Sequence, residues 1–176
     1  MTINFKLIKT SIAQIVFGAT ILFATTCHAD ALQRSDQERL EENLGKDKAD
    51  EVIKFFHKFR NSLENNNRQV VADMIRYPQT FLAARGNNPL YKLEIYNSSE
   101  LLKNYDSIFT STNKNILLNL TLNQECISYH HELNCGNKFQ PATQISIETT
   151  CDNDESIKNC HDYTIRVNKL FVSELN

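Results

Sequence analysis

Glycine is scarce in this chain of 176 residues, which has four of them. Beyond the first 29 residues only Gly45, Gly86 and Gly136 remain, so there is no glycine-rich loop of the kind that cradles phosphate groups in nucleotide-binding proteins. The motifs Gly-x-Ser-x-Gly of many hydrolases and His-Glu-x-x-His of zinc peptidases are also absent. No short motif of these kinds therefore predicts an enzymatic function.

Positive charge is not in excess either, with 19 lysines and arginines against 21 aspartates and glutamates. Two of the lysines lie within the first nine residues, which leaves 17 basic against 21 acidic residues and a net charge of −4 beyond them. Nucleic acids and anionic membrane surfaces are bound by clustered positive charge. We therefore expect neither of them as a partner.

The apolar run over residues 12–23 is shorter than the roughly 20 residues that a membrane-spanning helix needs. Two lysines precede it and small or polar residues follow it at 24–29, an order typical of a secretory signal peptide. We predict that residues 1–29 are a signal peptide, cleaved after Ala29, and that the mature protein is periplasmic with no stable membrane span. The alternative is a lipid anchor at Cys27, but Ala24 stands where such sites usually have leucine.

The mature chain of 147 residues has a common size for one domain with a single core. Residues 30–48 are mostly polar and predict a polar leader or a short helix. We expect residues 49–176 to form a single α+β domain.

Four cysteines remain in the mature chain, and an even number in an exported protein indicates two disulfides. Three pairings are possible. We favour Cys126 with Cys135 and Cys151 with Cys160, because each pair brackets a polar stretch that could join two antiparallel strands. Closing each loop is worth about 2–3 kcal/mol in the chain-entropy model. A zinc site is less favoured, since the Cys-x-x-Cys and His-x-x-x-His spacings are absent.

Helical patterns dominate the first half of the mature chain. An apolar stripe that includes Val52, Phe56, Phe59 and Leu63 predicts an amphipathic helix from residue 50 to the three asparagines at 65–67. A second, shorter helix is predicted to end before Pro78. Asn97 and Glu100 have the spacing of a capping box, which predicts a third helix over 98–109.

Strand patterns dominate the second half. A hairpin is predicted from 79–85 and 90–96 with a turn at 86–89, and further strands are predicted at 127–131, 144–149 and 163–172. Residues 115–122 fit either a helix end or a strand. Helices followed by an antiparallel sheet predict an α+β fold.

Residues 50–115 carry a recognisable succession of features. Phe55-Phe56-His57-Lys58-Phe59 lies in the first strong helix, Met74-Ile75-Arg76-Tyr77-Pro78 ends the second, and Tyr105-Asp106-x-Ile108-Phe109 closes the third. This arrangement resembles exported bacterial members of the nuclear-transport-factor-like superfamily, which has the cystatin-like fold. The resemblance implies N-terminal helices packed on a curved antiparallel sheet in the shape of a cone, here with disulfide-stapled β loops. Members of that superfamily include isomerases, hydratases and binding proteins.

A pocket inside such a cone could use tyrosine and aspartate side chains to stabilise an enolate or to move a proton. Five residues on or near the predicted helices are candidates for this pocket: His57, Asp73, Tyr77, Tyr105 and Asp106. We favour an architectural interpretation of them. Tyrosines in these positions usually pack with a bonded hydroxyl, and the aspartates are typical of helix surfaces.

Three further groups of residues resemble parts of known sites. Adjacent histidines in a strand point to opposite faces, so His130 and His131 are not expected to share a metal. A disulfide at Cys160 would remove the thiolate that a pair with His161 needs. The acidic run 152–155 lacks the ligand pattern of a calcium loop. We therefore expect no metal, cofactor or catalytic set.

The leading hypothesis is a non-enzymatic periplasmic binding protein, of the inhibitor or immunity type, that acts on a secreted toxin or a cell-wall hydrolase. Its basis is predicted export, rigid disulfide-stapled loops and the lack of a catalytic motif. The alternative is a small-ligand-binding protein or an isomerase-like or hydratase-like enzyme that uses the cone pocket. Fold alone does not decide between them.

Overall fold

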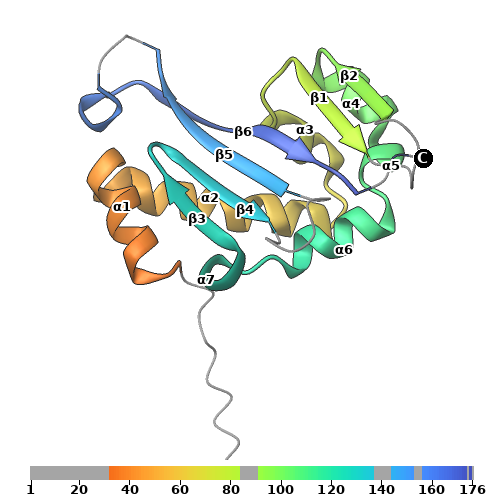
Figure 1. The fold of residues 1–176 in the computed structure, drawn as a ribbon. Coiled ribbons are helices and arrows are strands. Elements are labelled where there is room, and N and C mark those ends of the chain that lie inside the picture. The colour runs from red at the N-terminus through yellow and green to blue at the C-terminus, as the bar shows by residue number, and fades with distance from the viewer. Residues whose placement is uncertain (1–31, 84–90, 137–143, 153–155, 174, 176) are drawn as a thin grey trace, which may run out of the picture.

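The computed structural model describes residues 32–83, 91–136, 144–152, 156–173 and 175, and Figure 1 draws the whole chain. The predicted signal peptide, the turn at 86–89 and residues 153–155 of the acidic run lie outside the described residues. No helix of the described part is long and apolar enough to cross a membrane.

The chain begins with two helices, α1 (Arg34–Leu44) and α2 (Lys46–Glu64), joined at Gly45. The backbone of Gly45 has a φ of 82°, a conformation that glycine adopts without steric cost. The predicted stripe on α2 is buried, and Leu40 and Leu44 of α1 are fully buried in the same core. The polar segment before residue 48 therefore contains a helix that packs against the core.

Helix α3 (Arg68–Met74) follows and ends before the cis peptide bond between Tyr77 and Pro78. It leads into the antiparallel strands β1 (Gln79–Ala83) and β2 (Tyr91–Ile95). The predicted second helix and the predicted hairpin are thus both present.

The region predicted as one helix over 98–109 contains two, α4 (Ser98–Lys103) and α5 (Tyr105–Ile108). The predicted N-cap is confirmed, since the Glu100 amide donates to Asn97 Oδ1 at 2.9 Å. The Glu100 carboxylate accepts from the amide of Tyr96, one residue before the cap, at 2.8 Å. The break falls at Asn104, whose side-chain amide donates to the Glu100 carbonyl at 2.9 Å. Asparagine competes in this way with the backbone donors of a continuing helix.

Most of the undecided segment 115–122 is helical: it contains the end of α6 (Ser111–Asn119) and the first residue of α7 (Leu122–Glu125), with Leu120 and Thr121 extended between them. Beyond it lie the strands of one antiparallel sheet, β3 (Cys126–Tyr129), β4 (Glu132–Gly136), β5 (Gln144–Cys151) and β6 (Tyr163–Phe171), with the short 3-10 helix η1 (Ile157–Asn159) before β6. Strand β4 was not predicted, and the strand predicted to reach residue 131 ends at Tyr129, where the chain turns.

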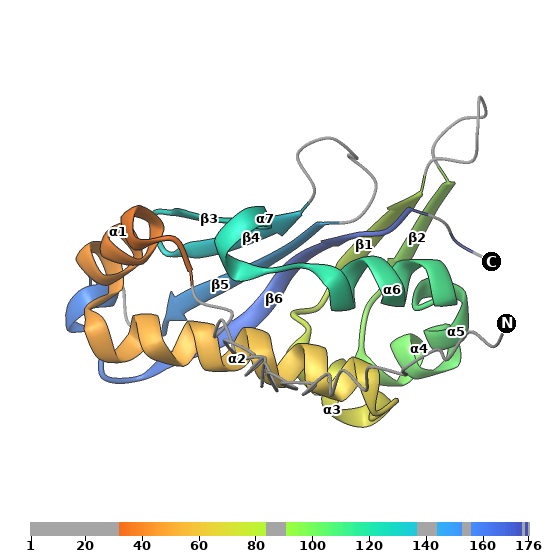
Figure 2. The ribbon, with the colours of Figure 1, turned by 90° about the horizontal axis from the view of Figure 1, so that it is seen from below.

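The α+β architecture is confirmed, with helices packed on a curved antiparallel sheet. Helix α2 lies behind the sheet in Figure 1 and below it in Figure 2, while α1 lies beside β3. Side chains in register on the strands, such as Leu133, Ile147 and Val167, are fully buried beneath the helices. The opposite face of β3–β6 has no described helix over it.

Both predicted disulfides are present. Cys126 and Cys135 are direct partners on β3 and β4, and their sulfur atoms are 1.99 Å apart. Cys151 at the end of β5 bonds to Cys160 just before β6, with an S–S distance of 2.05 Å. The local pairings favoured from the sequence are therefore confirmed.

Candidate functional site

The candidate site lies on the face of the four-stranded sheet over which no described helix lies. Cross-strand partners point to the same face of a sheet, so the register defines two rows of side chains there. One row runs Ile127, Asn134, Ser146, Lys169, and the other runs Tyr129, Glu132, Glu148, Arg166. We call this surface the open face.

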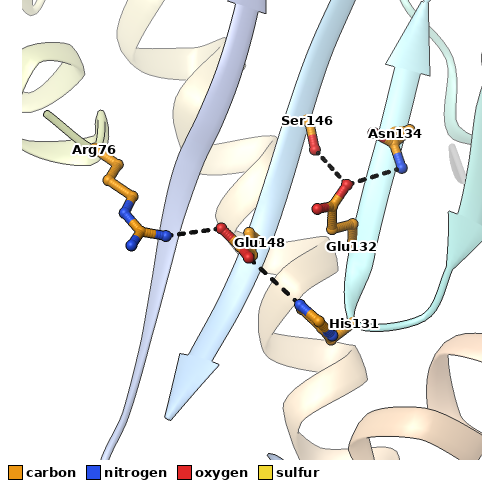
Figure 3. Close-up of polar contacts among 6 residues, drawn as sticks. All are labelled: Arg76, His131, Glu132, Asn134, Ser146 and Glu148. Atoms are coloured by element: carbon orange, nitrogen blue, oxygen red, sulfur yellow. Dashed lines mark hydrogen bonds and ion pairs between the residues drawn. The ribbon is translucent and has the colours of Figure 1, made fainter. Parts of the chain in front are cut away.

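Glu132 and Glu148 lie directly opposite each other on β4 and β5. Like charges in this position destabilise a sheet unless other groups compensate for them. Glu132 accepts hydrogen bonds through Oε2 from the Ser146 hydroxyl at 3.1 Å and from the Asn134 amide at 3.5 Å (Figure 3). Neutral donors therefore hold this carboxylate.

Glu148 is held by charged groups instead. Its Oε2 lies 3.0 Å from Arg76 Nη1 and its Oε1 lies 3.4 Å from His131 Nε2 (Figure 3). The Glu148 side chain is only 14% exposed, whereas Arg76 is 53% exposed. A carboxylate so shielded from water is costly to bury unless it is paired, and these two groups pair it.

The backbone fixes where Arg76 and His131 stand. Arg76 follows α3, and its amide donates to the Val167 carbonyl of β6 at 2.9 Å. His131 lies in the two-residue turn between β3 and β4, and its carbonyl accepts from the Thr149 amide at 3.2 Å. The residue before it, His130, has a φ of 52°, a left-handed conformation common in tight turns. Both side chains thus reach Glu148 from the ends of other elements.

A hollow of about 370 Å³ opens beside this cluster, lined by residues that include Ile127, Asn134, Gly136, Ser146 and Phe171. A Cβ atom at Gly136 would lie 2.5 Å from the Gln144 Cγ. Glycine at this position therefore keeps space between β4 and β5 on the open face.

Two apolar side chains stand out on the same face. Ile127 is 43% exposed and Tyr129 is 64% exposed, and among the described residues only Tyr96 is comparable as a large exposed apolar side chain. The Tyr129 ring packs against the His130 ring with centroids 4.2 Å apart. The open face therefore combines apolar contacts, a hollow and a polar cluster within a few residues.

The outer edge of β3 is closed by α1. Asp36 of α1 is buried and accepts a hydrogen bond from the Ser128 amide at 3.3 Å through Oδ1. Arg39 Nη1 lies 3.8 Å from the same oxygen. Because the carboxylate satisfies an outward amide of an edge strand, it blocks pairing with another chain at that point.

Tyr105 and Asp106, two of the candidates from the sequence, meet around Arg68. Arg68 donates two hydrogen bonds to the Asp106 carboxylate, at 2.9 and 2.8 Å, and lies 4.9 Å from the centroid of the Tyr105 ring. Tyr105 is fully buried, and its hydroxyl has no hydrogen-bond partner among the described residues. Burial raises the pKa of Tyr105 to about 12; Arg68 acts in the opposite direction and Asp106 in the same direction.

Asp73 and Tyr77 form a second neighbourhood. Asp73 is exposed and accepts from the Gln69 amide at 2.8 Å, and the Tyr77 hydroxyl donates to the Ala72 carbonyl at 2.9 Å. Burial, and then the nearby charge of Asp73, raise the pKa of Tyr77.

His57 stands apart on α2 and borders two surface hollows, neither of which is lined by any of the other four candidates. The structure therefore brings the candidates together as two pairs and leaves His57 separate. Their role as pocket residues stays a prediction.

Arg76, Glu132 and Glu148 were not predicted as site residues from the sequence, and His131 was considered only together with His130. Alternation of polar and apolar residues along 144–149 was the available signal, because it places Ser146 and Glu148 on one face. Nothing local marks Arg76, which reaches Glu148 across 72 residues of sequence.

Comparisons with protein-family models, with curated proteins and with solved structures found no match to this chain. The resemblance to the nuclear-transport-factor-like superfamily and its cone shape therefore stay predictions, and the functional argument depends on the geometry of the open face.

Proposed function

We propose that the protein is an exported, non-enzymatic binding protein that recognises a protein partner through the open face of its sheet. The compartment is the periplasm, and the partner is a secreted toxin or a cell-wall hydrolase that this protein inhibits. The observation that carries the proposal is the pair of exposed apolar side chains, Ile127 and Tyr129, beside a hollow on a sheet face over which no helix of the described residues lies.

The side chains of the open face are of the kinds that bind another protein. Tyrosine and isoleucine supply apolar contacts, while the half-buried Glu148 and its partners supply directional polar groups. The disulfide between Cys126 and Cys135 ties β3 to β4 beneath this surface. A surface that is already rigid loses little conformational entropy when it binds. Disulfides of this kind are also typical of exported proteins.

The alternative of a catalytic cone pocket has less support. The Tyr77 hydroxyl is engaged by a backbone carbonyl, and the Asp106 carboxylate is engaged by Arg68. Tyr105 is fully buried, and its ring packs against Phe109 with the centroids 4.6 Å apart. None of Tyr77, Tyr105 and Asp106 lines the hollow on the open face or the two hollows beside His57.

The proposal is tested by native mass spectrometry on the mature protein, recovered without reduction from its own cell envelope. We expect the protein to carry a second protein at fixed stoichiometry. The double variant Ile127→Ser/Tyr129→Ser is expected to lose that partner, because both apolar contacts are removed from the surface. The matched control is Tyr96→Ser, since Tyr96 is 60% exposed but follows β2 and belongs to no row of the open face.

Replacement of His57 or Asp73 by alanine is expected to leave the complex intact, because neither residue lies on the open face. A bare monomer in the wild-type sample would overturn the proposal. A partner retained by the double variant would show that binding uses another surface. A small bound mass in place of a protein would instead support the pocket hypothesis.

A further inference from the structure

We propose that His131, Glu132 and Glu148 form a binding site for a divalent transition-metal ion, with zinc the best fit. These are the described residues whose histidine and carboxylate ligand atoms all lie within 4.8 Å of one another. Imidazole nitrogen and carboxylate oxygen are both ordinary ligands of zinc. The inference is independent of the proposed function, since it needs no protein partner.

The separation of His131 and Glu148 suits a small tetrahedral ion. Two ligands at about 2.0–2.2 Å from zinc and at the tetrahedral angle are about 3.3–3.6 Å apart. His131 Nε2 and Glu148 Oε1 are separated by 3.4 Å, which matches one edge of that tetrahedron. The Glu132 carboxylate approaches from the neighbouring strand, and three protein ligands leave a fourth position for water.

The two carboxylates are already oriented by other groups. Glu148 engages Arg76 through Oε2, so its Oε1 is the oxygen that faces His131. Glu132 accepts from Ser146 and Asn134 through Oε2, which leaves Oε1 outside those two hydrogen bonds. Outer partners of this kind fix the orientation of metal ligands in many proteins (Figure 3).

The charges of the two glutamates also favour a bound cation. Glu132 and Glu148 are direct cross-strand partners, and a divalent cation between them would convert a repulsion into an attraction. A histidine in the set favours zinc over calcium and magnesium, which prefer oxygen ligands alone.

This inference revises the expectation from the sequence that no metal binds near His130 and His131. That expectation considered the two histidines as a pair in a strand. In the structure they lie in a turn, the His130 ring packs against Tyr129, and only His131 is directed to Glu148. The third ligand, Glu148, is 17 residues further along the chain than His131.

The test is isothermal titration calorimetry, with zinc chloride titrated into the purified protein, its disulfides intact, in metal-free buffer at pH 7.5. We expect binding of one zinc ion per chain. Substitutions of outer partners alone typically cost about 10–100-fold in metal affinity, so the variants His131→Ala and Glu148→Gln are each expected to weaken binding at least about tenfold. The matched control His130→Ala removes a histidine from the same turn and is expected to change the affinity less than about twofold.

Circular dichroism and a free-thiol count on each variant establish that it is folded. Absence of stoichiometric zinc binding by the wild type would overturn the proposal. Equal losses in His130→Ala and His131→Ala would overturn it as well, because they indicate unspecific binding by the turn. Calcium that binds as tightly as zinc would contradict the assigned ligand set.

Discussion

The most direct test of the core concerns the hydroxyl of Tyr105. This residue is fully buried beside Phe109, and its hydroxyl has no hydrogen-bond partner among the described residues. Replacement by phenylalanine removes the hydroxyl and keeps the ring in place. We expect Tyr105→Phe to stabilise the protein, which is unusual for a substitution in a core.

The magnitude follows from two opposing terms. Burying a hydroxyl without a hydrogen bond costs about 1–3 kcal/mol by protein mutational data, and the substitution removes that cost. An oxygen-sized void of roughly 15 Å³ costs about 0.4 kcal/mol at about 24 cal/mol per Å³. The contacts of Arg68 and Lys114 with the ring face, at 4.9 and 5.3 Å from its centroid, are available to phenylalanine too. The free energy of unfolding is therefore expected to rise by about 0.6–2.6 kcal/mol.

The pH dependence of stability is a second test of the buried Tyr105 hydroxyl. The pKa of Tyr105 is raised to about 12 in the folded protein, mainly by burial, against about 10 in an unfolded chain. Between pH 10 and 12 the unfolded chain therefore releases a proton that the folded protein retains. The stability contributed by this group is present below pH 10 and is lost as the pH rises toward 12. The advantage of Tyr105→Phe is expected to widen over that range.

Urea unfolding at pH 7 and at several values above pH 10 measures both effects. Tyr77→Phe is the matched control, because its hydroxyl donates to the Ala72 carbonyl at 2.9 Å. Loss of that hydrogen bond is expected to cost about 0.5–1.5 kcal/mol at pH 7. A destabilisation of Tyr105→Phe by about 1 kcal/mol or more would refute the reasoning, since it would mean that the hydroxyl has a partner.

Two further predictions concern the sheet. The double variant Cys151→Ser/Cys160→Ser is expected to lower the free energy of unfolding, measured in urea, by about 2–3 kcal/mol. Thiol titration of the unfolded, unreduced mature protein is expected to find no free thiol. Four free thiols would contradict the assignment of two disulfides. Asp36→Ala leaves the Ser128 amide without its acceptor. We therefore expect the free energy of unfolding in urea to fall by about 1 kcal/mol and hydrogen exchange of that amide to become faster. Unchanged exchange would show that α1 does not protect the edge of β3.

Much of the fold could be predicted because it depends on local patterns. The stripe on α2 buries Phe56 and Phe59 because they lie one turn apart on one side of a helix. The disulfide pairings could be predicted because the two cysteines of each pair are close in sequence and bracket a stretch that joins two antiparallel strands. In both cases the residues that decide the structure are near one another in sequence.

Other features were missed because distant residues or single side chains decide them. The break between α4 and α5 depends on one hydrogen bond from Asn104, which propensity does not reveal. Strand β4 is five residues long, and its pattern is clear only once β3 and β5 flank it. The cluster around Glu148 needs the register of the strands and the path of the chain after α3, neither of which is visible in a single sequence.

Contacts at both edges of the sheet favour its face over its edges as the surface for the proposed partner. On the β3 side, Asp36 of α1 occupies the outward amide of Ser128. On the β6 side, Ile75 forms a parallel bridge with Val167, and the Arg76 amide donates to the Val167 carbonyl. Addition of a strand from another protein needs a free edge, so a partner is expected to recognise side chains on the open face instead. Arg76 connects the two features, because its backbone closes the edge while its side chain reaches Glu148 at the centre of that face.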